Sequence, residues 1–169
     1  MFNYKTLDDL FEIADKKNEP LFVLILDGIE DPHNFGAILR SAETAGVHGV
    51  VIRKNRQVQV NDTVMRTSTN ASQLVPIARV VNIAETVSTL RDKGVMVFGV
   101  EIDGKALYNK VDFKSPVAIV VGSEGKGISH LVKQRCDEVI KIPMFGTINS
   151  LNVSVATGII LFEVIRQRT

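Results

Sequence analysis

The segment INSLNVSVATG, residues 148–158, places four polar side chains where an otherwise apolar helix should begin: Asn149, Ser150, Asn152 and Ser154. One capping side chain is enough to start a helix, so four exceed what the backbone requires. We expect Ser150 or Asn149 to be the cap. Asn152 and Ser154 then lie in the first turn and point into a polar cleft, with redundant capping as the alternative interpretation.

The residues just before this segment, IPMFGT at 142–147, interrupt the strand that precedes them. Pro143 and Gly146 break the strand and leave backbone N–H and C=O groups without partners. A planar heterocycle such as adenine can use these groups as hydrogen-bond partners. The two segments together predict a ligand-binding cleft.

The glycine-rich segment VVGSEGKGIS, residues 120–129, predicts a strand, a tight turn and a helix. This layout is typical of phosphate-binding loops, yet the residues match neither G-x-G-x-x-G nor G-x-x-x-x-G-K-[ST]. Glu124 in the middle of the turn would repel a phosphate, whereas the positive end of a helix tolerates a carboxylate. We expect the turn to bring its backbone close to a neutral or cationic ligand, or to hold a hydroxyl or amine through Glu124. An ordinary tight turn is the alternative.

A third polar stretch, DGIEDPHNFGAILRSAE at 27–43, follows another predicted strand. Asp31-Pro32 predicts a turn, Asn34 can cap the next helix, and Arg40 lies six residues further along that helix. Spacing alone fits an ordinary cap and a surface arginine equally well. Several carboxylates and one histidine lie nearby, but no second histidine has ligand spacing, so we expect no metal site.

The elements that must position these residues follow an α/β pattern. Five runs, nearly continuous in apolar residues, predict strands at 21–26, 48–52, 95–100, 117–122 and 138–143. Helical stretches are expected at 35–45, 83–93, 126–135 and 151–168, and the last is apolar almost all round, so we expect it to be mostly buried. The predicted fold is an open, mostly parallel sheet with helices on both faces, in which ligands gather at the carboxyl ends of the strands.

Composition sets the remaining limits. The 169 residues are best divided into one main domain, 21–169, preceded by a short amphipathic helix and a charged linker in residues 1–20. Cys136 is the only cysteine, which excludes an internal disulfide and favours a reducing cytoplasm. No apolar run approaches the roughly 18 residues that span a bilayer, so no membrane association is expected. A net charge of +1 does not by itself indicate a nucleic-acid partner.

Taken together, NFGAILR with Glu43, GSEGKG and IPMFGTINSLNVSVATGIILFE resemble the three signature motifs of the SpoU (TrmH-type) branch of the SPOUT RNA methyltransferases. The resemblance covers about residues 20–168. Within that branch, LDGIEDPHNFGAILRSAETAGVHGVV is most similar to the enzymes that methylate a guanosine ribose 2′-hydroxyl of 23S ribosomal RNA. The resemblance implies S-adenosylmethionine as methyl donor, a carboxyl-terminal trefoil knot in the catalytic domain, and a homodimer.

The resemblance also assigns roles to positions of this chain. It implies a catalytic group made of Asn34, Arg40, Glu124, Ser150 and Asn152. It implies donor contacts, largely through backbone, from Val100, Glu101, Gly122, Ser123, Gly125, Ile142, Met144, Gly146, Ser150 and Leu151. The basic residues expected to contact RNA are Arg40, Arg53, Lys54, Arg56 and Arg66.

The reaction implied by the resemblance requires the 2′-hydroxyl to attack the sulfonium methyl in line, so positioning and proton removal are the two demands. Arginine is essentially always protonated. Our hypothesis is that Arg40 binds the adjacent phosphate and lowers the effective pKa of the hydroxyl, while Asn34, Glu124 and Asn152 orient Arg40 and the ribose.

Two features depart from the resemblance. Asn70, in TSTNAS at 67–72, stands where relatives tend to carry a glycine, and we expect a changed local turn. Many relatives also carry an amino-terminal RNA-binding domain. Residues 1–20 are therefore interpreted as a linker remnant, so the chain is either an excised catalytic domain or a short enzyme of the kind that acts on transfer RNA.

Three functions remain open. The leading one is transfer of a methyl group to a ribose 2′-hydroxyl, with ribosomal guanosine first, a transfer-RNA ribose second and an antibiotic-resistance site on the ribosome third. The second is a non-catalytic module that binds S-adenosylmethionine and RNA. The third is an unrelated nucleotide-binding enzyme such as a dehydrogenase, which the missing dinucleotide fingerprint disfavours.

Overall fold

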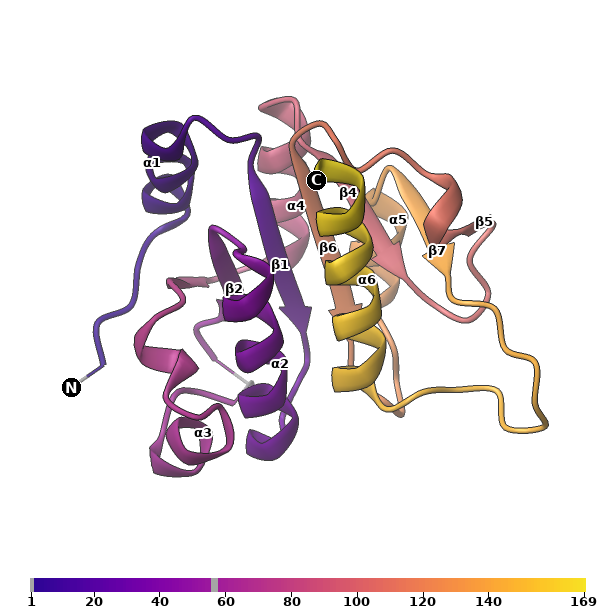
Figure 1. Ribbon diagram of the computed structural model, residues 1–169, viewed down its shortest axis with the longest axis horizontal. Coiled ribbons are helices and arrows are strands. Elements are labelled where there is room, and N and C mark those ends of the chain that lie inside the picture. Colours follow the sequence, from indigo (N-terminus) through magenta and orange to yellow (C-terminus); the bar gives the residue numbers. More distant parts are fainter. Residues whose placement is uncertain (1, 56–57) are drawn as a thin grey trace.

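The computed structural model describes residues 2–55 and 58–169 and contains a seven-stranded sheet in the order β3-β2-β1-β6-β4-β7-β5 (Figure 1). Every pair of neighbouring named strands is parallel. This confirms the predicted open, parallel sheet. The strands are β1 (Phe22–Asp27), β2 (Gly49–Arg53), β3 (Ile77–Val80), β4 (Met96–Val100), β5 (Ala106–Leu107), β6 (Val117–Gly122) and β7 (Glu138–Lys141).

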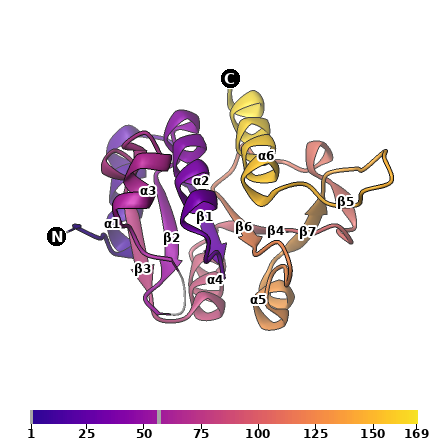
Figure 2. The ribbon, with the colours of Figure 1, turned by 90° about the horizontal axis from the view of Figure 1, so that it is seen from below.

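Helices cover both faces of the sheet, as predicted (Figure 2). The helices are α1 (Leu7–Lys17), α2 (Pro32–Ala45), α3 (Asp62–Thr67), α4 (Ile83–Asp92), α5 (His130–Arg135) and α6 (Val153–Arg168), with 3₁₀ turns η1 (Ala71–Gln73) and η2 (Tyr108–Lys110). One core cluster joins the sheet to α2 and α6, for example through Phe35 and Leu161. The other joins it to α1, α4 and α5, for example through Leu10, Val87 and Val132. The central strands β1 and β6 are buried throughout, which explains their unbroken apolar sequences.

Helix α2 begins one turn earlier than expected. Asp31 is its cap, accepting the backbone N–H of His33, and Pro32 occupies the first helical position. Asn34 therefore lies inside the first turn, and the prediction that it caps the helix is wrong. Proline suits the first position because its missing N–H has no helical partner there. At the other end, Gly46 stops the helix as predicted, with a φ of 72°.

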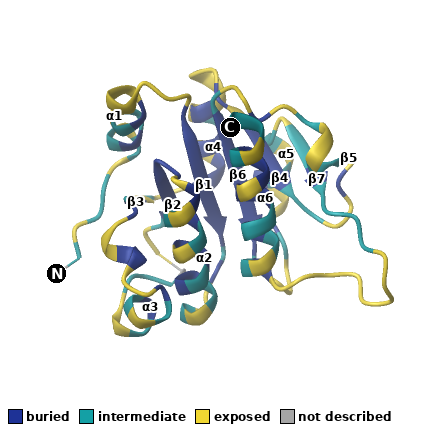
Figure 3. Ribbon diagram, in the orientation of Figure 1, coloured by how far each residue is buried: buried dark blue, intermediate teal, exposed yellow. Residues whose placement is uncertain are grey.

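Helix α6 begins at Val153, and its cap is Asn152, so the prediction of Ser150 or Asn149 as cap is wrong. The expectation that this helix is mostly buried is also wrong. One side packs on the sheet and on α2, but Val155 and Phe162 on the outer side are 51% and 46% exposed (Figure 3). A helix in the outer layer has only one face turned to the core, whatever its composition.

Two other boundaries differ from the sequence-based expectation. Helix α5 begins at His130 because Gly127, with a φ of 67°, turns the chain before it, and Ser129 is the residue at the cap position. Strand β7 ends at Lys141, two residues before Pro143. Both differences lengthen the loops at the carboxyl ends of the strands.

The sequence did not predict the edge strands β3 and β5 as strands. The polar stretch 53–72, expected to carry short surface structure, contains α3 and the start of η1. Asn70 adopts the left-handed conformation with a φ of 64°, which asparagine tolerates better than most residues other than glycine. A glycine-like turn is thus kept here, contrary to our expectation of an altered one.

The amino-terminal segment is attached to the same sheet. Lys5 forms a bridge with Ala78 of β3, and Leu10 and Ala14 of α1 are buried. His48 accepts the N–H of Phe22 through Nδ1 at 2.9 Å and contacts Glu19 through Nε2 at 2.9 Å. Burial lowers the pKa of His48, so the neutral ring that this pairing requires is favoured.

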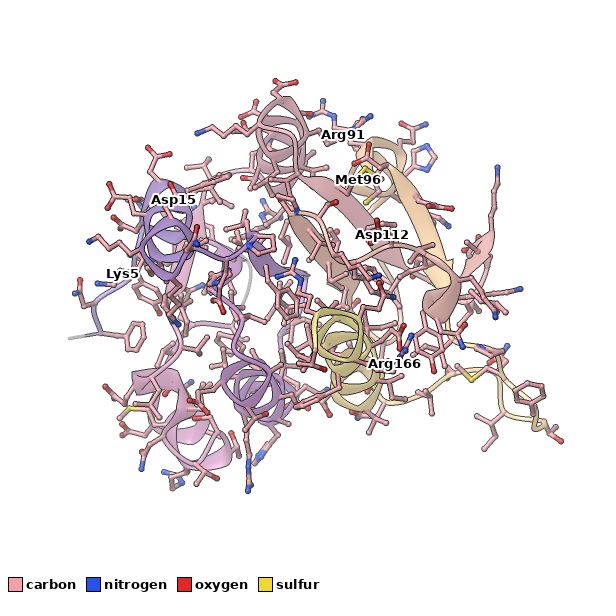
Figure 4. All side chains as sticks on the ribbon, turned by 45° about the horizontal axis from the view of Figure 1, so that its top comes forward. Lys5, Asp15, Arg91, Met96, Asp112 and Arg166 are labelled. Carbon is pink, nitrogen blue, oxygen red and sulfur yellow. The ribbon has the colours of Figure 1, made fainter. Side chains whose placement is uncertain are left out.

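At the amino-terminal ends of the strands, a charged pair links α4 to the residue before β7. Arg91 lies at the end of α4 close to Met96 at the start of β4 (Figure 4). The Nε–H of Arg91 donates to Asp137 at 2.9 Å, and the other oxygen of Asp137 accepts the N–H of Val97. In the described part of the chain, no helix is long and apolar enough to cross a bilayer.

Candidate active site

The three polar stretches meet at the carboxyl ends of the strands, with Asn152 at their centre. The Nδ2 of Asn152 donates to Oε1 of Glu124 at 2.9 Å and to Oδ1 of Asn34 at 3.3 Å. Its Oδ1 accepts the backbone N–H of Ser154 at 2.9 Å. One amide therefore joins residues separated by more than a hundred positions, and the structure brings together three of the five expected catalytic residues.

Glu124 is fixed at the amino-terminal end of α6. Besides Asn152, its Oε1 accepts the backbone N–H of Val153 at 3.2 Å. A carboxylate is stabilised there by the helix dipole and by the unpaired N–H groups of the first turn. The Nδ2 group of Asn34 has no partner among the described residues, so it remains available as a donor for a substrate.

Two cavities lie on either side of this cluster and share a wall. The first cavity, of about 460 Å³, lies between the end of β4, the loop after β6 and the loop before α6. The second cavity, of about 600 Å³, lies between the end of β1, the start of α2 and the same loop after β6. Residues 123–127 and Val153 line both cavities, so a group bound in one can face a group bound in the other.

Most residues expected to contact the donor line the first cavity: Val100, Glu101, Gly122, Ser123, Gly125, Ile142, Met144, Ser150 and Leu151. Gly146 does not line it and lies further out in the exposed loop. Apolar side chains, exposed backbone and a few polar groups give this cavity the character of a small-molecule site. Asp103 and Lys133 also line it, and no sequence pattern selects them.

The loop after β6, residues 123–129, is held by carboxylates from two strands. Asp27 at the end of β1 accepts both the backbone N–H and the Oγ–H of Ser129 at 2.8 Å. Glu101, just after β4, accepts the N–H of Ile128. Gly122 lies so close to Gly127 that a Cβ there would overlap the Gly127 carbonyl group. The glycines therefore serve close backbone packing.

Three charged side chains, Glu101, Asp103 and Lys133, form a cluster in the wall of the first cavity. The Nζ of Lys133 contacts both oxygens of Asp103, at 3.0 and 2.9 Å, and lies 3.9 Å from Glu101. Burial raises the pKa of Glu101, and the charge of Lys133 and the N–H of Ile128 oppose that rise. The hydrogen bond to Asp103 raises the pKa of Lys133 and lowers that of Asp103.

Basic residues are spread more widely than expected. Arg53 lines the second cavity, Lys54 follows it at the end of β2, and Arg66 is exposed on α3. Arg56 lies outside the described residues. Arg40 is exposed on α2, lines neither cavity, and its guanidinium has no hydrogen bond to the described residues. The structure thus separates Arg40 from the Asn34–Glu124–Asn152 cluster of its own chain.

Two carboxylates around the second cavity have partners within the chain. No group of three or more His, Cys, Asp or Glu residues suited to a metal ion occurs in residues 2–55 and 58–169. Asp31 caps α2, and Asp27 is engaged with Ser129.

Comparison with known proteins bears on the same motifs. The family model described as SpoU rRNA Methylase family matches residues 21–162. The putative TrmH family tRNA/rRNA methyltransferase YacO of Bacillus subtilis (strain 168) is 46% identical over 167 residues, which cover 99% of this chain and 67% of that protein.

Solved structures give the same relationship. The SpoU methyltransferase AviRb from Streptomyces viridochromogenes, in complex with the cofactor AdoMet, superposes with a TM-score of 0.81 at 30% identity over 89% of this chain and 58% of that one. The AdoMet-bound rRNA methyltransferase from Sinorhizobium meliloti gives a TM-score of 0.85 at 29% identity over 99% and 62%. The chain spans between 58% and 67% of the length of these three relatives. The resemblance of the three motifs is confirmed, and the chain belongs to the SpoU family of RNA methyltransferases, which use S-adenosylmethionine as methyl donor.

Proposed function

We propose that this domain, residues 21–169, transfers a methyl group from S-adenosylmethionine to a ribose 2′-hydroxyl in RNA, with a guanosine of 23S ribosomal RNA as the first candidate target. The observation that carries the proposal is the shared wall between the two cavities, where Glu124, Asn152 and Asn34 meet. A donor in the first cavity and a ribose in the second face each other across this wall.

The first cavity fits the donor in size and chemistry. Its volume of about 460 Å³ lies within the range of small-molecule sites, and Val100, Ile142 and Met144 suit a heterocycle. Glu124 in the GSEGKG turn suits a cationic sulfonium better than a phosphate. When bound, the donor supplies an electrophilic methyl group.

The residues of the chain position the hydroxyl and stabilise the charge that develops. Asn34 offers a free amide donor to the ribose, and Glu124 holds Asn152 in place. Arg40 binds the neighbouring phosphate through its fork of N–H groups and lowers the effective pKa of the 2′-hydroxyl. Ser150 lines the first cavity beside the donor.

We propose further that two copies of the chain pair through the outer face of α6, in a domain whose carboxyl-terminal region forms a trefoil knot. Val155 and Phe162 form an exposed apolar stripe, and Gly158 between them lies against Ser41 of α2. Arg40 is the neighbour of Ser41, so pairing through the stripe places Arg40 at the edge of the interface. This arrangement accounts for its separation from the cluster of its own chain.

Methyl transfer and its site on RNA can be measured together. The protein is incubated with labelled S-adenosylmethionine and either 23S ribosomal RNA or transfer RNA, and the product is hydrolysed with alkali. A label retained in alkali-resistant dinucleotides supports ribose methylation, and the RNA that carries it identifies the target. Label on a base, or no transfer with donor and RNA both bound, contradicts the proposal and favours the non-catalytic module.

The position of Arg40 across an interface has its own test. Arg40→Ala and Glu124→Ala are each expected to be inactive, and mixing equal amounts should restore about a quarter of wild-type activity, because half of the pairs then contain one intact site. Mixing without recovery shows that Arg40 and Glu124 act within one chain.

A further inference from the structure

The group Glu101, Asp103 and Lys133 is not explained by methyl transfer itself. All three side chains line the first cavity and none lines the second. Glu101 is largely buried, with its side chain 20% exposed, whereas Asp103 is mostly exposed. A buried carboxylate in the wall of a ligand cavity is costly unless it is paired or used for binding.

Glu101 is held in a defined orientation. It accepts the N–H of Ile128, and its Oε2 lies 2.7 Å from the position that a Cβ on Gly127 would take, so a side chain there would push the carboxylate aside. The φ of 67° at Gly127 also favours glycine. The ammonium of Lys133, fixed by Asp103, approaches to 3.9 Å. A carboxylate has about four lone-pair sites, and these contacts leave acceptor positions for a ligand in the cavity.

The shared wall sets the direction of the donor. The methyl group must face the second cavity, hence the side of the first cavity formed by residues 123–127 and Val153. The adenosine part extends toward the walls that only the first cavity has, which include Val100, Ile142 and Met144 as well as Glu101. Adenosine carries two kinds of donors there: the exocyclic amine and the two ribose hydroxyls.

We propose that the Glu101 carboxylate accepts hydrogen bonds from the vicinal hydroxyls of the donor ribose, and that Lys133 and Asp103 act as positioning residues for it. The two oxygens of one carboxylate can accept from two neighbouring hydroxyls. In dinucleotide-binding folds an acidic residue hydrogen-bonds the ribose of the cofactor in a similar way. The apolar side chains suit the adenine ring. The inference rests on the proposed use of the first cavity for the donor.

Lys133 supports this role through charge. Burial favours the protonated form of Glu101, and the nearby carboxylates Asp103 and Asp27 act in the same direction. Lys133 opposes them and favours the ionised form of Glu101, which acts only as an acceptor. Exchange of Lys133 for methionine removes this support while keeping an unbranched side chain of similar length.

The test measures binding by calorimetry, without RNA or turnover. Wild type and Glu101→Gln are titrated with S-adenosylhomocysteine, its 2′-deoxy analogue and 5′-methylthioadenosine, which keeps the ribose but lacks the amino-acid part. Glu101→Gln is expected to weaken binding of S-adenosylhomocysteine and 5′-methylthioadenosine about 10-fold, as loss of a charge-assisted hydrogen bond does, and to weaken binding of the deoxy analogue less, because only its 3′-hydroxyl remains as a donor. Glu12→Gln on α1, outside both cavities, is the matched control.

Other outcomes overturn the inference in different ways. A loss for S-adenosylhomocysteine but not for 5′-methylthioadenosine assigns Glu101 to the amino group of the donor. Equal losses with the deoxy analogue show that the carboxylate does not contact the 2′-hydroxyl, and they contradict a contact with both hydroxyls. If the wild type binds none of the three ligands, the proposed donor site itself fails.

A second variant separates binding from folding. Glu101→Asp keeps the charge but withdraws the carboxylate by one methylene group, and a similar loss of affinity is expected in a protein that still folds and unfolds cooperatively. Full affinity in Glu101→Asp contradicts a directed contact. Lys133→Met is expected to lose affinity mainly at acidic pH, and a uniform loss at all pH values argues against its proposed role.

Discussion

Two loops build most of the first cavity, and they are held in opposite ways. Loop 123–129 is tied to the ends of two strands by Asp27 and Glu101. Loop 142–152 makes its hydrogen bonds only at its last residue, Asn152, among the described residues. Phe145 in this second loop is 94% exposed and Ile148 is 78% exposed.

The difference separates a preorganised wall from an adaptable one. A loop fixed before binding loses little conformational entropy when the ligand arrives, whereas a free loop must be ordered at that moment. Exposed apolar residues in the free loop then find partners in the donor, the RNA or a second copy of the chain. We infer that loop 123–129 fixes the position of the donor and loop 142–152 closes over it.

The largest effect on donor affinity is expected from adding a methyl group at Gly122, where loop 123–129 begins. A Cβ there overlaps backbone atoms of Gly127 and Ile128, which have no room to move away. Gly122→Ala is expected to weaken binding of S-adenosylhomocysteine about 100-fold by forcing loop 123–129 away from the end of β6.

The matched control lies in the same loop. A Cβ on Gly125 meets nothing within 4 Å, so Gly125→Ala should leave the free energy of unfolding close to the wild-type value, whereas Gly122→Ala should lower it. Urea denaturation of both variants decides the point. Equal behaviour of the two variants, in either direction, contradicts tight packing of loop 123–129 against Gly122.

The second largest effect is expected from Asp27. Asp27→Ala leaves the N–H and Oγ–H of Ser129 without their acceptor, which costs about 1–3 kcal/mol in the free energy of unfolding and weakens donor binding. Ser129→Ala removes only the hydroxyl and should cost less. Urea denaturation gives the stabilities, and a larger loss for Ser129→Ala contradicts the assigned role of Asp27.

The strands show how much of the fold can be predicted from the sequence. The buried strands β1 and β6 follow directly from their apolar runs, because a parallel sheet covered on both faces buries the side chains of both faces. Strand β3, with only four residues and an exposed Arg79, and strand β5, with two, have no such signal. They form because neighbouring strands offer an edge.

The cap of α6 and the position of Arg40 show a second limit of prediction from the sequence. Four polar residues between positions 149 and 154 could cap α6, and the choice of Asn152 is made by Glu124, a residue 28 positions away that no local pattern includes. Arg40 and Asn34 belong to one motif, yet six residues at about 100° each place them about 120° apart around the helix. Sequence patterns selected candidate residues for the site, whereas long-range contacts determine which of them meet.

A smaller effect is expected in the free loop. Phe145→Ser should leave the free energy of unfolding within about 0.5 kcal/mol of wild type, because the ring makes no buried contact in the single chain. Urea denaturation at low protein concentration provides the measurement. A loss as large as that of Asp27→Ala means that loop 142–152 is packed after all, and the distinction between the loops fails.

The smallest effect is expected in how the two loops respond to a fall in pH. Loop 123–129 depends on Glu101, whose pKa is raised by burial, whereas no titratable side chain occurs from Pro143 to Leu151. Because the folded state binds the Glu101 proton more tightly than the unfolded chain, protonation of this group does not by itself destabilise the fold as the pH falls. It does remove the ionised acceptor that the donor ribose uses.

Binding of 5′-methylthioadenosine, which has no amino-acid group to titrate, should therefore stay constant near neutral pH and weaken as the pH falls toward the raised pKa of Glu101. Titration from about pH 8 to about pH 5 measures this. Lys133→Met should move the onset to higher pH, since the ammonium that favours ionised Glu101 is gone. Hydrogen exchange of residues 144–150, corrected for its intrinsic pH dependence, should not change over the same range. A shared acid response of both loops would show that they move as one unit, so that fixing one of them also fixes the other.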